Sequence, residues 1–82
     1  MIMKIYDAVK NRILELLYKK NFSIHKLAVL SGVAPSTIKN ILYGKSQNPG
    51  ISTLKMLCDG LDISIVEFFE TEEFLNLEQE LG

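Results

Sequence analysis

The sequence has little of the chemistry that metal centres and disulfide frameworks need. It contains one cysteine, Cys58, one histidine, His25, and no tryptophan. A single cysteine excludes an intramolecular disulfide and a multi-cysteine zinc site, and a single histidine excludes a histidine cluster. We therefore predict no metal and no cofactor. The sequence also has no glycine-rich phosphate loop and no Cys–His pair close together, which argues against an enzyme.

Long hydrophobic runs are missing as well. The longest stretch without a charged residue, 27–38, has 12 residues and contains Gly32 and Pro35. It is too short to cross a bilayer, which takes about 20 apolar residues. Lys4 and Asp7 interrupt the start of the chain before the apolar core of a signal peptide develops. We expect a soluble cytoplasmic protein without a membrane partner.

The residues that are present suit one small folded domain. The 82 residues are 48% hydrophobic. A chain of this size buries only about 60% of the surface that its unfolded form exposes, so its core must be compact.

Charge divides the chain into two parts. Residues 1–55 contain all nine Lys and Arg and only two acids, Asp7 and Glu15, which gives a net charge of +7. Residues 56–82 contain eight acids and no base, which gives −8. This asymmetry predicts a surface for a polyanion and an opposite end that repels it. The alternative is an acidic segment that only keeps the chain soluble.

Apolar spacings of three and four residues predict helices throughout. The first covers 3–20. The second follows an N-cap at Ser23 and ends at Gly32, and the third runs from Pro35 to Gly44. The fourth covers 53–61 after a cap at Ser52, and the fifth follows a cap at Ser64. A sixth helical segment, or a continuation of the fifth helix, is expected to place three residues on one face: Phe74, Leu77 and Leu81. The predicted class is all-α.

Residues 24–43 carry the pattern that is most informative about function. Two short helices meet across a turn at Gly32, which forces them to cross steeply. Ala28 is small enough for a close crossing. The apolar positions that would pack the two helices are Leu27, Val33, Ile38 and Ile41. This pattern resembles the helix-turn-helix motif, whose second helix enters the DNA major groove.

The resemblance extends over roughly residues 5–70. It rests on the segments 23–28, 31–33, 36–38, 44–45, 48–49, 53–54 and 61–64. With them the chain resembles the phage-repressor-like (XRE-type, lambda-repressor-like) family. The resemblance implies a compact five-helix DNA-binding domain over 1–70, with its recognition helix at about 35–43 and an acidic amphipathic segment at 71–82. It also implies a dimeric transcriptional regulator that binds double-stranded DNA at a pseudo-palindromic operator.

The recognition helix offers three side chains for base contacts. At about 100° per residue, Ile38, Ile41 and Leu42 lie on one side of the helix. Asn40 on the opposite side can pair with adenine, Lys39 can reach guanine, and Ser36 can contact either base. Pro35 departs from the commoner pattern, in which a long polar side chain opens this helix. It can make only an apolar contact, for example to a thymine methyl.

Candidate contacts to the DNA backbone surround the recognition helix. Helix N-termini bind anions, and the loop after the recognition helix is where the resemblance places a phosphate clamp. The candidates are Ser23, His25, Thr37, Tyr43, Lys45, Ser46, Gln47, Asn48 and Lys55. Four alternatives stay open: the polar side of the recognition helix is an ordinary solvated face, His25 is plain surface, Tyr43 packs beside the loop, and Lys55 is only a solvated surface residue.

The segment after residue 70 is the candidate dimer interface, through Phe74, Leu77 and Leu81. The alternative is that it folds back on its own domain. An alternative function also follows from the acidic segment: an antitoxin-like or anti-regulator module whose main partner is another protein.

Overall fold

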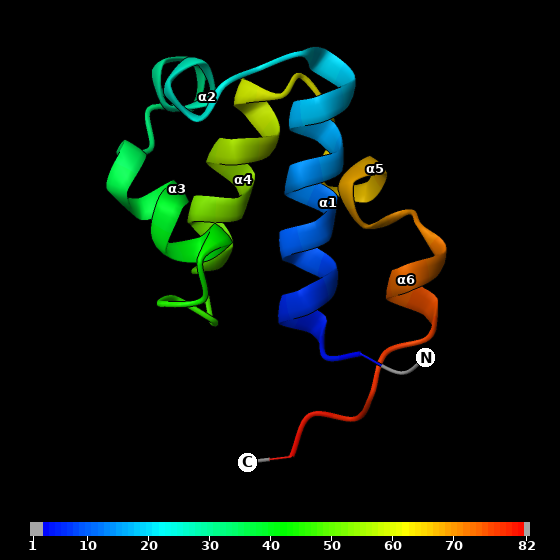
Figure 1. Cartoon of the computed structure of the whole chain (residues 1–82). Coiled ribbons are helices and arrows are strands. Elements are labelled where there is room, and N and C mark those ends of the chain that lie inside the picture. The colour runs from blue at the N-terminus through cyan, green and yellow to red at the C-terminus, as the bar shows by residue number, and fades with distance from the viewer. Residues whose placement is uncertain (1–2, 82) are drawn as a thin grey trace.

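The computed structural model describes residues 3–81 and confirms the all-α fold (Figure 1). Its helices are α1 (Ile5–Lys20), α2 (Ile24–Ser31), α3 (Pro35–Leu42), α4 (Ile51–Gly60), α5 (Ile65–Phe69) and α6 (Glu72–Leu75). α2 packs against α3 and α4, α4 packs against α5, and α1 packs against α3 and α6. Within residues 3–81, no helix has the length and apolar character needed to span a membrane.

The helix α1, with 16 residues, is the longest of the described helices. Its buried stripe includes Val9, Ile13, Leu16 and Leu17, at the spacing that the sequence predicts. The helix ends at Asn21, which adopts the left-handed conformation with φ 55° and donates its N–H to the Tyr18 carbonyl. Asparagine tolerates this conformation better than most residues, so the end of α1 is fixed by the residue type.

The α2–turn–α3 unit forms as the sequence predicts. Ser23 caps α2, because its Oγ accepts a hydrogen bond of 3.0 Å from the Lys26 amide. Gly32 ends the helix with φ 74°, where a side chain would be strained. Pro35 then occupies the first turn of α3, where its missing N–H costs nothing.

The predicted cap of α4 is wrong. The helix begins at Ile51 after an N-cap at Gly50, and Ser52 lies inside its first turn. Gly50 is extended, and its carbonyl accepts the first helical bond from the Leu54 amide at 3.1 Å. The loop therefore ends at Pro49-Gly50. Gly50 starts the helix, because glycine is itself an acceptable N-cap.

One continuous core joins the helices. Its fully buried side chains are Ile13, Leu27, Ile38, Ile41, Leu57, Cys58, Leu61 and Phe68. Burial raises the pKa of the Cys58 thiol, as expected for a cysteine that only packs. The helices α2 and α4 approach each other closely at Gly60, where a Cβ would lie 2.8 Å from the Ser31 amide nitrogen.

Arg12 is buried, although the charge pattern of the sequence predicts that it belongs to the basic surface for a polyanion. Its Nε and Nη2 donate hydrogen bonds of 2.8 Å to the carbonyls of Phe68 and Glu67, at the end of α5. Its Nη1 donates to Glu15, and this contact lowers the pKa of that carboxyl. Arg12 thus fastens α5 to α1 and contributes little to the surface charge.

The C-terminal segment is helical only at its start, so the predicted helical face over Phe74, Leu77 and Leu81 is wrong beyond Leu75. The helix α6 ends at Leu75, and Leu77 forms an isolated parallel β-bridge with Met3. The Glu78 amide donates to the Met3 carbonyl at 2.8 Å. Backbone pairing with the start of the chain replaces the next helical turn.

Candidate nucleic-acid interface

The outer face of α3 is polar and open to solvent. Ile38, Ile41 and Leu42 point into the core. The three predicted base-contact residues, Ser36, Lys39 and Asn40, are all exposed. One side of this short helix packs against the core, so the other side is accessible to a ligand.

A hydrogen bond from the first helix fixes the position of α3. Tyr6 Oη donates to the Ile41 carbonyl at 2.7 Å, across 35 positions in the sequence. The bond satisfies a carbonyl at the end of α3 and ties it to the start of α1. No local signal in the sequence points to this role of Tyr6, because only the tertiary fold brings the two residues together.

The N-terminus of α2 lies beside this face. Ser23 uses its side chain for the cap, while His25 is exposed. This cap satisfies the Lys26 amide, so the amides of Ile24 and His25 are the ones in the first turn that can donate to an anion.

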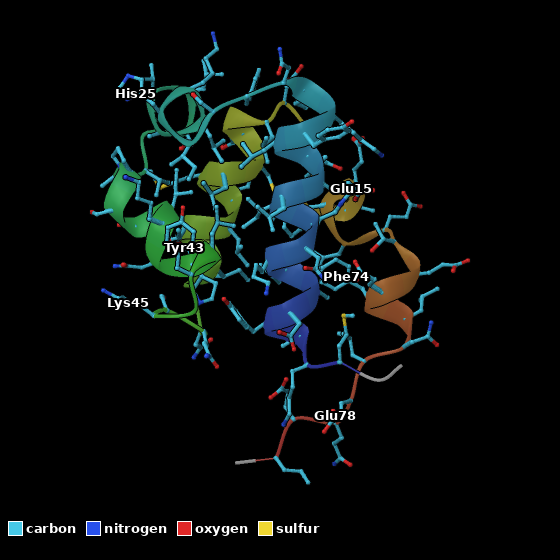
Figure 2. All side chains as sticks on the ribbon, in the orientation of Figure 1. Glu15, His25, Tyr43, Lys45, Phe74 and Glu78 are labelled. Carbon is cyan, nitrogen blue, oxygen red and sulfur yellow. The ribbon has the colours of Figure 1, made fainter. Side chains whose placement is uncertain are left out.

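The loop after α3 continues the same surface. Gly44 turns the chain with φ 85°, and the Ser46 amide donates to the Asn40 carbonyl at 2.9 Å. Gln47 Nε2 donates to the Gly44 carbonyl at 3.2 Å. Tyr43, Lys45, Gln47 and Asn48 are exposed, Ser46 is half-buried, and Thr37 is exposed on α3. Figure 2 shows His25, Tyr43 and Lys45 on the side of α2 and α3, and Glu15, Phe74 and Glu78 on the other side.

Ion pairs engage several of the basic residues with acids of the same chain. Lys4 lies 4.0 Å from Glu80, Lys19 lies 3.5 Å from Glu15, and Lys55 pairs with Asp59 on the same helix. Lys26, Lys39 and Lys45 are exposed on α2, α3 and the following loop. Lys55 is therefore more engaged within the chain than the sequence suggests.

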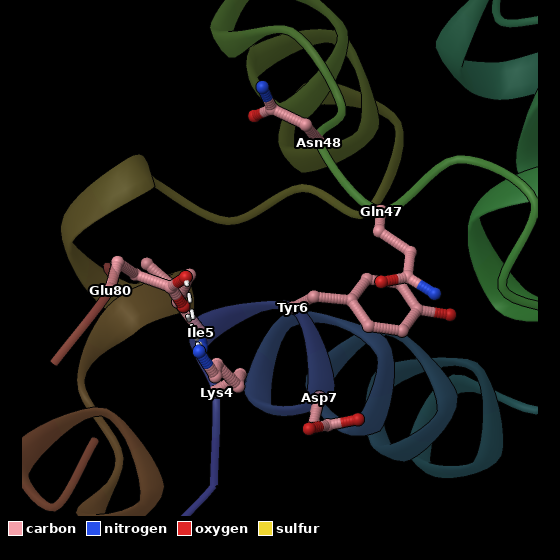
Figure 3. A pocket seen from close by; sticks show the side chains of 7 residues that line it. All are labelled: Lys4, Ile5, Tyr6, Asp7, Gln47, Asn48 and Glu80. Carbon is pink, nitrogen blue, oxygen red and sulfur yellow. Dashed lines mark hydrogen bonds and ion pairs between the residues drawn. The ribbon is translucent and has the colours of Figure 1, made fainter. Parts of the chain in front are cut away.

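Behind the loop lies an open hollow of about 560 Å³, drawn in Figure 3. The side chains of Tyr6 and Gln47 lie next to each other there, and Glu80 reaches the start of α1. The Ile5 amide donates to Glu80 Oε1 at 3.3 Å. The end of the described chain thus closes on the first turn of α1, close to the loop but behind the exposed face of α3.

The predicted dimer residues have three different environments. Phe74 is half-buried against Phe68 and Phe69, with ring centroids 6.2 Å and 4.8 Å away. Leu77 is half-buried beside Met3, and Leu81 is exposed. Of the three side chains, only Leu81 is therefore exposed.

Two short helices that cross at a left-handed glycine, with the polar face of the second exposed, define a helix-turn-helix protein. Comparison with known families matches residues 12–73 to the Cro/C1-type HTH DNA-binding domain. The chain belongs to this family, which confirms the resemblance seen in the sequence.

Individual relatives agree with this family. The HTH-type transcriptional regulator SlrR of Bacillus subtilis (strain 168) is 37% identical over 57 residues, which make up 70% of this chain and 38% of that protein. The wild-type restriction-modification controller protein C.Esp1396I has a TM-score of 0.78 and 28% identity over 85% of this chain and 92% of its own. Prophage Lp1 protein 11 has a TM-score of 0.77 and 29% identity over 89% of this chain and 96% of its own.

Proposed function

We propose that this protein is a sequence-specific transcriptional regulator that binds a pseudo-palindromic operator as a homodimer, with α3 in the major groove. The observation that carries the proposal is the exposed polar face of α3, which is followed in the chain by a loop with the exposed Lys45. The names of its relatives support the same role: SlrR is a transcriptional regulator, and C.Esp1396I is a controller protein.

In this proposal the side chains of α3 read base edges. Asn40 pairs with adenine, Lys39 donates to guanine, and Ser36 contacts a neighbouring base. All three are exposed, so they can reach a ligand without disturbing the core.

Phosphates are held on both sides of the reading helix. The N-terminus of α2 with Ser23 and His25 takes one backbone segment. The loop with Lys45, Ser46, Gln47 and Asn48 takes another, and Thr37 and Tyr43 flank α3. Lys55 joins them only by releasing Asp59, so its contribution is the smallest.

A dimer is proposed because one domain offers few specific contacts, each giving about 1–3 kcal/mol of discrimination. We assign residues 1–70 to DNA binding and 71–82 to dimerisation. Leu81 presents exposed apolar surface there, together with Leu75, which is 82% exposed. Phe74 and Leu77 hold the segment against its own domain.

The test separates reading from holding. Asn40→Ala should cost about 1–3 kcal/mol on the operator and little on random DNA, because a base contact carries sequence information. Lys45→Ala should weaken both duplexes about equally and reduce the salt slope by about one unit. Binding is measured on operator and random duplex at several salt concentrations, and Lys19→Ala, on the side of Glu15, is the control.

If Asn40→Ala weakens both duplexes equally, or leaves the operator affinity unchanged, Asn40 does not read a base. If the purified protein selects no preferred sequence from a random pool, the proposed function itself is wrong.

A further inference from the structure

An apolar hollow of about 360 Å³ lies at the turn between α2 and α3. Its walls include Ala28 and Val29 from α2, Gly32, Val33 and Ala34 from the turn, and Pro35 from the first turn of α3. His25 contributes the polar side chain of the lining. The hollow opens at the end of α3 that precedes the proposed base readers.

The chemistry of the walls selects an apolar occupant. Val29 on α2 is 66% exposed, so an apolar side chain is in contact with water there. Ala34 is the N-cap of α3 and provides no side-chain hydrogen bond, and Pro35 has no N–H to donate. A polar group placed against these residues would lose its hydrogen bonds to water without replacement.

The position of the hollow further restricts which apolar group can occupy it. Pro35 directly precedes Ser36, so a duplex read by α3 presents its major-groove edges here. On that edge of a pyrimidine, the apolar group is the methyl at C5. Thymine carries this methyl, and so does 5-methylcytosine.

We propose that the hollow lined by Val29, Ala34 and Pro35 receives the 5-methyl group of one pyrimidine in each operator half-site. This inference rests on the proposed function, because it requires α3 to lie in the major groove. These three residues are then specificity determinants. They recognise the methyl group by its shape, because Pro35 stands where a hydrogen-bonding side chain is lacking.

The experiment uses the full chain and an operator selected by it from random duplexes. Each thymine is replaced singly by uracil, which lacks only the methyl. At one thymine per half-site the replacement should weaken binding about fourfold, the equivalent of one buried methyl group at ~0.8 kcal/mol. A second arm places cytosine or 5-methylcytosine at that position, and the methylated base should bind more tightly. Weaker binding in the uracil arm supports the proposal, and the second arm shows whether the hollow also takes the methyl group of 5-methylcytosine.

Matched variants locate the methyl contact. Val29→Ser replaces an apolar wall, so the ratio between thymine and uracil should fall towards one. Leu30→Ser, at the next residue of α2, changes a 48% exposed side chain outside the hollow and should keep the fourfold ratio. Pro35→Ala serves as a second wall variant if Val29→Ser unfolds, and melting curves check each protein.

Uracil without effect at every operator thymine would overturn the proposal. So would an equal thymine-to-uracil ratio in the wild type, Val29→Ser and Pro35→Ala. Failure of the proposed function looks different, because then no operator is selected at all.

Discussion

Arg12 holds two elements together through a single side chain. Its guanidinium reaches the carbonyls of Phe68 and Glu67 and the carboxylate of Glu15, all at 2.8 Å. The planar fork of arginine supplies several donors in fixed directions, so one residue satisfies both carbonyls at the end of α5. This explains how a charged residue can sit inside the stripe that α1 buries.

Arg12→Ala should destabilise the domain by about 2–4 kcal/mol, because two carbonyls lose their partner and a space remains. Lys19→Ala is the control, since Lys19 also pairs with Glu15 but at the surface, where such pairs are worth about 0–1 kcal/mol. Urea denaturation followed by circular dichroism measures both. Equal stability of the two variants would show that Arg12 does not fasten α5.

Among the elements, α2 and α4 are packed closely against each other. Gly60 lies within α4, and a Cβ there would meet Ser31 N and Ser31 Cβ at 2.8 Å. The obstacle includes backbone atoms, so α2 and α4 would have to move apart. Gly60 thus serves a close approach of helices, although its backbone is helical.

Gly60→Ala should therefore destabilise the fold by about 1–3 kcal/mol, in spite of the higher helix propensity of alanine. Gly50→Ala is the comparison without a clash, because the nearest atom to its Cβ would be Thr53 Oγ1 at 4.0 Å and the variant loses only the N-cap preference for glycine. Thermal melting of the two variants gives the comparison. A gain in stability for Gly60→Ala would mean that α2 and α4 separate without cost.

Local sequence signals predicted α1, α2, α3 and α5 because their ends depend on nearby residues, such as Ser23, Gly32 and Ser64. They also predicted the exposed face of α3, since Ile38, Ile41 and Leu42 had to point inward. They failed for Arg12 and Tyr6, whose partners lie 35 or more positions away. They failed again after Leu75, because the backbone of Met3 competes with the helix for Glu78.

Over the whole molecule, the internal ion pairs leave a smaller basic surface than the composition suggests. Lys4, Lys19, Lys55 and Arg12 all have acidic partners. Lys26, Lys39 and Lys45 remain on the α2–α3 side and its loop. Within residues 3–81, the exposed lysines outside these ion pairs thus lie on α2, α3 and the following loop, whereas Lys10 and Lys20 on α1 are half-buried.

Salt should weaken operator binding steeply. A dimer with about 3–5 phosphate contacts per subunit should give a log–log slope of roughly −6 to −9, because each neutralised phosphate releases counterions. Titrations between low and physiological salt measure the slope. A slope shallower than about −2 would place the DNA on another surface.

The proposed dimer needs a test that spares the core. Deleting residues 71–82 would also remove Phe74 from its contacts with Phe68 and Phe69, so a loss of affinity would have two explanations. Replacing both Leu75 and Leu81 by Ser changes only exposed surface and should leave the melting temperature unchanged.

We expect the wild type to sediment as a dimer at tens of micromolar and the double variant, Leu75→Ser with Leu81→Ser, as a monomer. The variant should then lose operator affinity far more than affinity for a single half-site, because only the full operator uses both reading heads. Leu14→Ser, at an exposed position of α1, is the control and should remain dimeric. A monomeric wild type, or a double variant that stays dimeric with full operator affinity, would remove residues 71–82 from the interface.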